Sequence, residues 1–137
     1  MKLFINNAIA LGFHLLLAVG VSATATIFFS GSAVWDWLLL LLPMLLYTVC
    51  GFCLKPLRKR TYLSPLSVAV LLAALLLITF IFGFNLTAYL LANPFLAAVD
   101  GLGTPAVSKA LLPISPLIPS LLMLAGITLR KRFLREI

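Results

Sequence analysis

Two cysteines, Cys50 and Cys53, form a C-x-x-C pair, a spacing at which thiols exchange disulfides or contribute to a metal site. Thiol exchange requires an accessible thiolate in electropositive surroundings, which Lys55 and Arg58 could supply. A structural zinc site requires four ligands, and the only histidine, His14, lies several helical turns away in the expected register. We therefore interpret the pair as two small buried thiols.

His14 lies within a long apolar run, where an ionisable side chain is a functional candidate. Counting residues from the basic ends of the apolar runs places Tyr47 and Thr48 at the same depth. The structural interpretation is a neutral imidazole hydrogen-bonded to a neighbouring helix. The functional interpretation is a role in binding a proton or a substrate. No carboxylate lies at this depth, which disfavours a proton relay.

Asp36 stands between Trp35 and Trp37 near the start of the second apolar run. A charge at the centre of a bilayer costs about 2.5–3.5 kcal/mol on the insertion scale, and less near the interface. Asp36 can therefore face the lipid headgroups or cap its helix. Asn85 approaches the same outer layer from the third run, so a small polar cluster is the functional alternative.

Enzyme chemistry finds little support in these residues. The chain has no paired carboxylates, no Ser/His/Asp set, no cluster of metal ligands and no phosphate-binding glycine loop. We expect neither catalytic activity nor a cofactor.

The composition sets the class of protein. Of 137 residues, 64% are hydrophobic and 9% are charged, against about 25% charged in soluble domains. A soluble fold of this size still exposes about a third of its unfolded surface, which three acidic and ten basic residues cannot cover. This excludes a water-soluble monomer, a disordered tail, a disulfide scaffold and a nucleic-acid-binding domain.

Four apolar runs have the length of a membrane span, for which about 20 residues suffice. They cover about 8–29, 34–54, 66–91 and 110–129, and leave no room for a second domain. We predict an all-α fold in a single domain, 1–137, arranged as a polytopic integral membrane protein with a four-transmembrane-helix bundle. The first run also resembles a signal peptide, but it continues through Phe29, which favours a retained span.

Basic residues indicate the orientation of these spans. Nine of them fall on one side: Lys2 before the first run, Lys55, Arg58, Lys59 and Arg60 after the second, and Arg130, Lys131, Arg132 and Arg135 after the fourth. Only Lys109 falls on the other side. The positive-inside rule then places both termini in the cytoplasm, in a multi-pass protein of the plasma membrane. The two basic clusters are candidate docking sites for anionic lipid headgroups or for an acidic partner.

Prolines interrupt the fourth run. Pro116 and Pro119 would lie inside a span that began near residue 110, so a regular helix can start only at about Leu117. We therefore predict a fourth crossing whose outer half is irregular, which lipid tolerates only against protein or a water-filled cavity. The preceding outer loop, 93–112, carries two Asn/Thr-Pro helix starts and predicts short helices at the membrane surface.

Small residues predict how the helices pack. Ala8, Gly12, Gly20 and Thr24 line one stripe of the first helix, which predicts a central helix in close contact with its neighbours. Pro43 predicts a kink in the second helix.

A faint internal repeat relates the second and fourth runs. Pro43 and Pro119 each begin a stretch that ends in Leu-Arg-Lys-Arg, at 57–60 and 129–132. A duplicated hairpin would give a pseudo-twofold axis along the membrane normal. Basic residues that stop a helix at the cytoplasmic face explain the similarity equally well.

Two functions fit these features. The first is a small non-catalytic accessory, regulatory or scaffolding subunit that acts through helix–helix contacts with another membrane protein or with itself as a homo-oligomer. The second is a small oligomeric transporter or channel that uses His14 and the broken fourth helix. Its partners in either case include anionic headgroups on the cytoplasmic side and no nucleic acid.

Overall fold

The computed structural model of the chain describes residues 2–27, 33–55, 61–82 and 113–136. These residues are helical apart from short turns and contain no strand, so the all-α class is confirmed for them. The elements, in chain order, are α1 (Lys2–Ile27), α2 (Ala33–Cys53), a 3-10 helix η1 (Thr61–Val68), α3 (Ala69–Phe82) and α7 (Leu117–Glu136).

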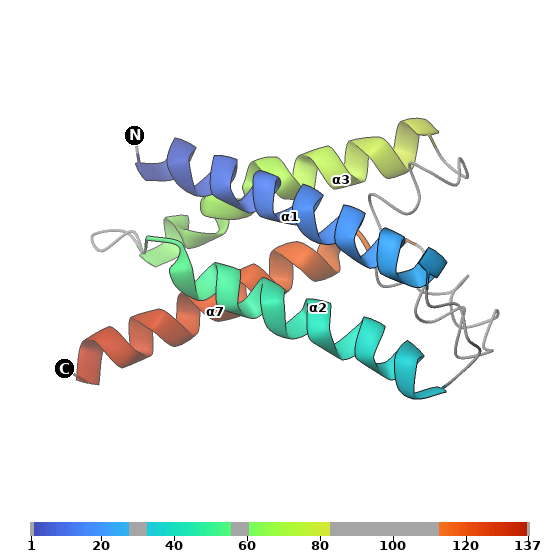
Figure 1. Cartoon of the computed structure of the whole chain (residues 1–137). Helices are drawn as coiled ribbons and strands as arrows, with labels where there is room; N and C mark the ends of the chain where they lie inside the picture. Colours follow the sequence, from blue (N-terminus) through green and yellow to red (C-terminus); the bar gives the residue numbers. More distant parts are fainter. Residues whose placement is uncertain (1, 28–32, 56–60, 83–112, 137) are drawn as a thin grey trace.

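The helices form a ring in which each contacts two others. α1 contacts α2 and α3, and α7 contacts the same two helices from the opposite side. Both ends of the chain lie at the same end of the bundle, together with the last residues of α2 and with η1 (Figure 1). We call this the inner end, and the opposite one, where α2 begins, the outer end.

The closest approach in the ring is between α2 and α7. A Cβ atom added to Gly51 would lie 2.0 Å from the Met123 carbonyl oxygen, and one added to Gly126 would lie 2.1 Å from that of Thr48. Only glycine permits two helix backbones to approach so closely. The contact is reciprocal, because each glycine faces the residue three positions before the other glycine.

The small-residue stripe of α1 does not serve the same purpose. An added Cβ at Gly12 or Gly20 meets no described atom within 4 Å, and Ala8 on the same stripe is exposed. The expectation that this stripe packs closely against a neighbouring helix is therefore wrong for Gly12 and Gly20 among the described residues. Glycines are needed instead at the α2–α7 crossing, because any side chain there would collide with the backbone of the other helix.

The helix bounds agree with the predicted runs in part. α7 begins at Leu117, as the prolines predict, with Pro119 in its first turn where a missing N–H is harmless. It continues through the basic residues to Glu136, beyond the expected end near 129. α1 likewise begins at Lys2 rather than near residue 8, and α2 continues through Pro43.

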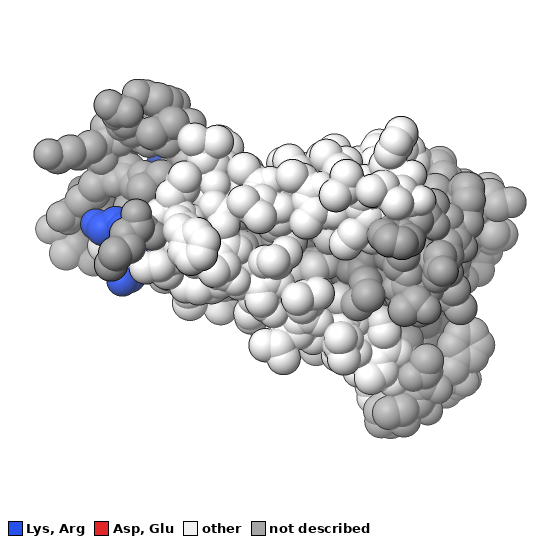
Figure 2. Space-filling model, turned by 90° about the horizontal axis from the view of Figure 1, so that it is seen from above, with Lys and Arg blue, Asp and Glu red and all other residues white. Residues whose placement is uncertain are grey.

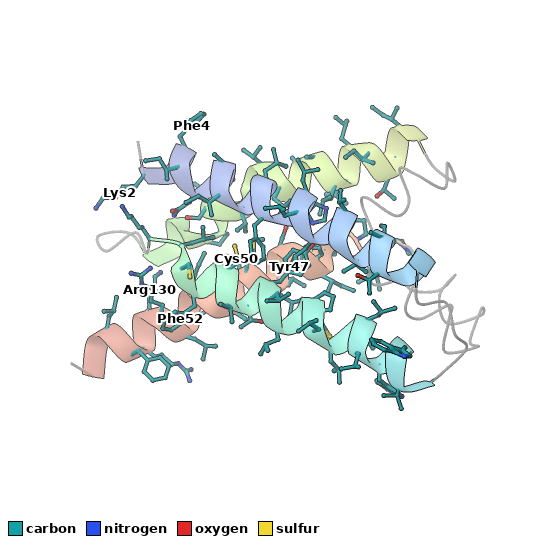
Figure 3. The ribbon with its side chains drawn as sticks, in the orientation of Figure 1. Lys2, Phe4, Tyr47, Cys50, Phe52 and Arg130 are labelled. Atoms are coloured by element: carbon teal, nitrogen blue, oxygen red, sulfur yellow. The ribbon has the colours of Figure 1, made fainter. Side chains whose placement is uncertain are left out.

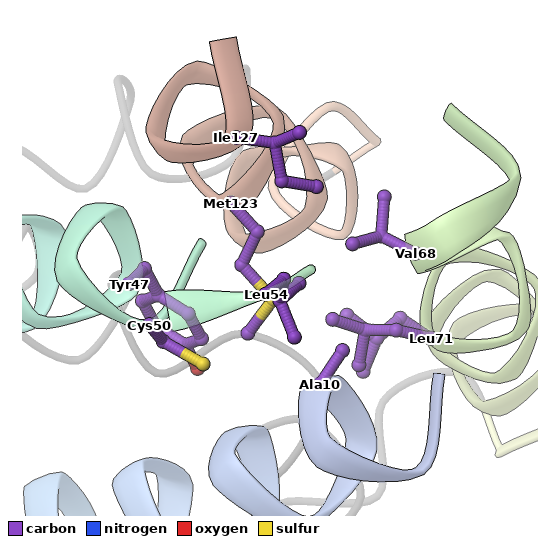
Figure 4. Packing of buried hydrophobic residues seen from close by; sticks show 9 residues of the cluster. Ala10, Tyr47, Cys50, Leu54, Val68, Leu71, Met123 and Ile127 are labelled. Carbon is purple, nitrogen blue, oxygen red and sulfur yellow. The ribbon is translucent and has the colours of Figure 1, made fainter. Parts of the chain in front are cut away.

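A single hydrophobic core lies in the inner half of the bundle. Its members come from every helix of the ring and point toward one another (Figure 4). They are Ala10, Tyr47, Cys50, Leu54, Val68, Leu71, Leu75, Met123 and Ile127. Burial of these side chains fixes the inner ends of the helices against each other.

One described helix, Lys2–Thr24, is long and apolar enough to cross a membrane. The apolar stretches Trp37–Cys53 and Pro65–Ile81 are shorter. Four crossings therefore stay a prediction. The expected short helices of the outer loop 93–112 lie outside the described residues.

Candidate functional site

A buried polar pair joins α1 to α2 near the middle of the bundle. The Tyr47 hydroxyl lies 2.7 Å from His14 Nδ1, and the side chains are 1% exposed at His14 and 0% at Tyr47. The centroids of the His14 and Tyr47 rings lie 5.9 Å apart. The Phe13 ring meets the Tyr47 ring edge-on, with a centroid distance of 6.2 Å. Depth counting in the sequence places Tyr47 beside His14, and the structure brings these two together.

The chemistry open to this pair follows from the imidazole. A neutral histidine has one donor and one acceptor nitrogen, so the tyrosine hydroxyl can donate to Nδ1 when the proton is on Nε2. The pair can hold α1 and α2 in register, because either partner alone would be a buried polar group at a cost of about 1–3 kcal/mol. It can also bind a proton, which is the chemistry of the functional interpretation.

Asn6 builds a second polar contact at the inner end. Its Nδ2 donates to the Lys55 carbonyl at 2.9 Å and to Ser67 Oγ at 3.2 Å, and its Oδ1 accepts from the Lys55 N–H at 3.2 Å. The amide thus satisfies both backbone groups of the residue two positions beyond the end of α2. It joins α1, the end of α2 and η1 at one point.

Asn7 does the same for the start of α3. Its Nδ2 donates to the Leu66 carbonyl at 2.8 Å and to the Leu3 carbonyl at 3.0 Å, and its Oδ1 accepts from the Val70 N–H at 3.0 Å. The 3-10 helix η1 changes to α geometry between Val68 and Ala69. Because first-turn N–H groups have no intrahelical acceptor, Asn7 supplies one from the neighbouring helix.

Arg130 closes the inner end from α7. Its Nη1 donates to the carbonyls of Phe52, Cys53 and Leu54 at 3.2, 3.0 and 3.0 Å. These carbonyls belong to the end of α2, which is the negative end of its dipole. Figure 3 shows Arg130 against this end of α2. We call Asn6, Asn7 and Arg130 the inner clamp.

The other predicted docking residues share this end where the structure describes them. On the face seen in Figure 2, the described basic side chains gather at one end of the molecule. Lys55 and Arg132 are exposed, and Lys131 is half-buried. Arg135 lies in α7, though its side chain is outside the described part. Arg58, Lys59 and Arg60 lie outside the described residues.

The predicted outer cluster lies outside the described side chains. Asp36 lies in the first turns of α2, but its side chain is outside the described part of the chain, as is the whole of Asn85. Trp35 and Trp37 beside it are exposed at the outer end.

No protein-family model, curated protein or solved structure matches this chain.

Two of the grooves on the bundle are lined by described residues. The outer groove, of about 300 Å³, lies between α1 and α2. Its lining is almost entirely apolar: Leu17, Gly20, Val21, Thr24, Trp35, Leu38, Leu39, Leu42, Pro43 and Leu46. The inner groove, of about 620 Å³, lies between the end of α2 and the last turns of α7, and is lined by Phe52, Cys53, Arg130, Phe133 and Leu134.

The cysteine pair is split between two environments. Cys50 is buried in the core, Cys53 is exposed in the inner groove, and both are free thiols. The expectation of two buried thiols is therefore wrong for Cys53, because α2 ends there and leaves its last turn at the surface. Among the described residues, no three His, Cys, Asp or Glu side chains lie together.

Ser120 is a buried polar residue that the sequence interpretation missed. Its side chain is 2% exposed, and its hydroxyl has no hydrogen-bond partner among the residues that the structure describes. The hydroxyls of Thr48 and Thr79, by contrast, donate to carbonyls four residues earlier in their own helices. Ser120 precedes Gly126 by nearly two helical turns, which places it outward of the α2–α7 crossing, toward the depth of Tyr47.

Proposed function

We propose that this chain is a small non-catalytic integral membrane protein that serves as an accessory, regulatory or scaffolding subunit through helix–helix contacts. It crosses the plasma membrane four times, with both termini and the segment 56–60 in the cytoplasm. Residues 110–129 make the fourth crossing, with an irregular outer half before α7.

The outward-facing side chains carry this proposal. Phe80 is 90% exposed and Phe4 is 79% exposed, and Phe4 points away from the bundle in Figure 3. The same holds for large apolar residues on every helix, among them Leu16, Val19, Leu45, Ile81 and Leu121. Water-soluble monomers rarely expose apolar patches above a few hundred Å², whereas a lipid environment favours such a surface.

The charge distribution supports the proposed orientation. The described basic residues Lys2, Lys55 and Arg130 lie at the inner end, and the aromatic pair Trp35 and Trp37 lies at the outer end. Basic residues favour the cytoplasmic side and tryptophans favour either interface.

The exposed stripe of α1 supports lateral association. Gly12 and Gly20 leave open space beside the helix, and small residues are the usual surface for close packing between membrane helices. No described residue occupies the space beside these two glycines, and a helix of a partner or of a second copy would pack there.

Affinity purification in mild detergent tests the proposal. The wild-type protein should recover a stoichiometric partner chain or a homo-oligomer. Gly12→Leu with Gly20→Leu should abolish that recovery without lowering the temperature at which the protein unfolds. Ala73→Leu places the same side chain at an exposed site on α3 and should keep the partner. Recovery of a monomer alone, in every detergent tried, contradicts the proposal.

The second candidate function is a small oligomeric transporter or channel. The buried His14–Tyr47 pair favours it, since an ionisable side chain within a membrane bundle marks many substrate and proton pathways. The buried Ser120 hydroxyl, which has no hydrogen-bond partner in the described part of the chain, is a further polar group inside the bundle. In reconstituted vesicles, His14→Gln should then reduce the flux of protons or of a substrate across the membrane. An unchanged flux would remove the main support for this function.

A further inference from the structure

The inner groove combines a cation with an apolar lining. Arg130 lies in it beside the aromatic side chains Phe52 and Phe133, whose rings meet edge-to-face at 6.0 Å. Leu134 and Cys53 complete the lining. A site of this composition matches a ligand with one anionic group and an attached hydrocarbon chain.

Arg130 is fixed in place and still has donors to offer. All of its hydrogen bonds to the described residues leave from Nη1, toward the carbonyls of Phe52, Cys53 and Leu54. A guanidinium carries five N–H donors in a rigid fork, so the groups at Nη2 and Nε remain for another acceptor. Neutral carbonyls accept the Nη1 bonds, and the positive charge of Arg130 therefore remains available.

The surrounding charge also selects an anion. Lys131 and Arg132 follow Arg130 on α7, and Lys55 follows the end of α2. Planar guanidinium groups bind phosphate in a bidentate manner, and each further basic residue near a membrane surface strengthens attraction to anionic lipid.

We propose that the inner groove is a binding site for an anionic phospholipid of the cytoplasmic leaflet. The lipid phosphate accepts hydrogen bonds from Arg130, and an acyl chain lies along Phe52, Phe133 and Leu134. The proposal rests on the proposed membrane topology, which puts the inner end at the level of the cytoplasmic headgroups. This site differs from a general attraction of anionic lipid to the basic clusters, because Arg130 and the inner groove would determine which lipid is retained.

Native mass spectrometry of the whole protein in mild detergent tests this site. Phosphatidylglycerol and phosphatidylcholine with the same acyl chains are titrated in turn. Both lipids carry the phosphate that Arg130 would bind, but phosphatidylcholine also carries a choline cation, which Arg130 and its basic neighbours repel. We therefore expect one phosphatidylglycerol to be retained with a preference of about tenfold over phosphatidylcholine. Arg130→Gln should remove this preference.

Two further variants separate the groove from overall charge and from folding. Arg132→Gln makes the same change of charge on a residue outside the groove lining and should lower retention by no more than about fivefold. Cys53→Phe narrows the groove with a bulky side chain without changing the charge or the backbone carbonyl that accepts from Arg130, and should lower retention about tenfold. If Arg130→Gln unfolds the protein, Cys53→Phe still tests whether the groove binds the lipid.

The outcomes are distinct. Equal losses for Arg130→Gln and Arg132→Gln, with full retention by Cys53→Phe, would overturn the site and leave only a charged surface. A co-purifying protein chain in the groove in place of lipid would overturn it as well. Failure of the wild-type protein to insert into phosphatidylcholine vesicles, measured by alkaline extraction, would contradict the proposed function rather than this site alone.

Discussion

The inner and outer halves of this bundle are held together by different forces. At the inner end, the clamp of Asn6, Asn7 and Arg130 binds backbone groups at the ends of neighbouring helices, and the hydrophobic core lies directly beside it. In the outer half, α1 and α2 leave an apolar groove of about 300 Å³. Hydrogen bonds to backbone groups have one geometry, whereas apolar contacts in lipid are easily exchanged for others. The inner end is therefore the fixed part, and the outer half is where helices can separate.

The largest loss of stability should come from a substitution at the α2–α7 crossing, which lies in the inner half. Gly126→Leu forces a side chain into the backbone of α2, where even a Cβ would lie 2.1 Å from the Thr48 carbonyl oxygen. We expect a loss of about 3 kcal/mol or more of folding free energy, with little folded protein recovered. Thermal unfolding in detergent measures it. Wild-type stability in this variant would mean that the two helices do not cross there.

Removal of an asparagine from the inner clamp should come next. Asn7→Leu leaves the Leu66 carbonyl and the Val70 N–H without their partner. An unsatisfied buried group costs about 1–3 kcal/mol, and hydrogen exchange at the start of α3 should rise. Phe4→Leu, on the exposed side of the same helix end, is the matched control and should change little. Equal effects of the two substitutions would argue against the clamp.

The mid-bundle pair should give a smaller effect. Tyr47→Phe removes only the hydroxyl that pairs with His14 at 2.7 Å. We expect a loss of about 1 kcal/mol, measured by denaturant or thermal unfolding. If the pair is purely structural, flux in reconstituted vesicles stays unchanged while stability falls. A fall in flux at unchanged stability would favour the transporter instead.

The smallest effect should have the opposite sign. Gly20→Ala in the outer groove places a methyl group where no described atom lies within 4 Å. Alanine in a helix interior is favoured over glycine by about 0.5–1 kcal/mol, so the variant should unfold at a slightly higher temperature. A clear destabilisation would show that the outer half is packed as tightly as the α2–α7 crossing.

Much of the helical architecture is predictable from local rules. The start of α7 at Leu117 follows from the restriction that Pro116 and Pro119 impose on the backbone. The pairing of His14 with Tyr47 follows from depth counting along two antiparallel helices. The first prediction depends only on the backbone geometry of proline. The second depends on counting residues in both helices from their basic ends, which lie at the same level.

The clamp and the crossing could not be predicted in the same way. Asn6 and Asn7 precede the apolar run that begins at Ala8, so hydropathy alone assigns them to a flank. Gly51 stands inside the C-x-x-C pair, and its partner Gly126 lies in a different run. Which of several glycines meets another backbone is a tertiary property. Two adjacent asparagines at the end of an apolar helix were the available signal for the clamp.

Four crossings with the inner end in the cytoplasm underlie both proposals. Single cysteines introduced at positions 31, 58, 100 and 137, in a chain with Cys50 and Cys53 replaced by serine, can be labelled in intact cells with a membrane-impermeant maleimide. Positions 31 and 100 should label from outside, and positions 58 and 137 only after the cells are opened. Labelling of 58 and 137 from opposite faces of the membrane would contradict this topology.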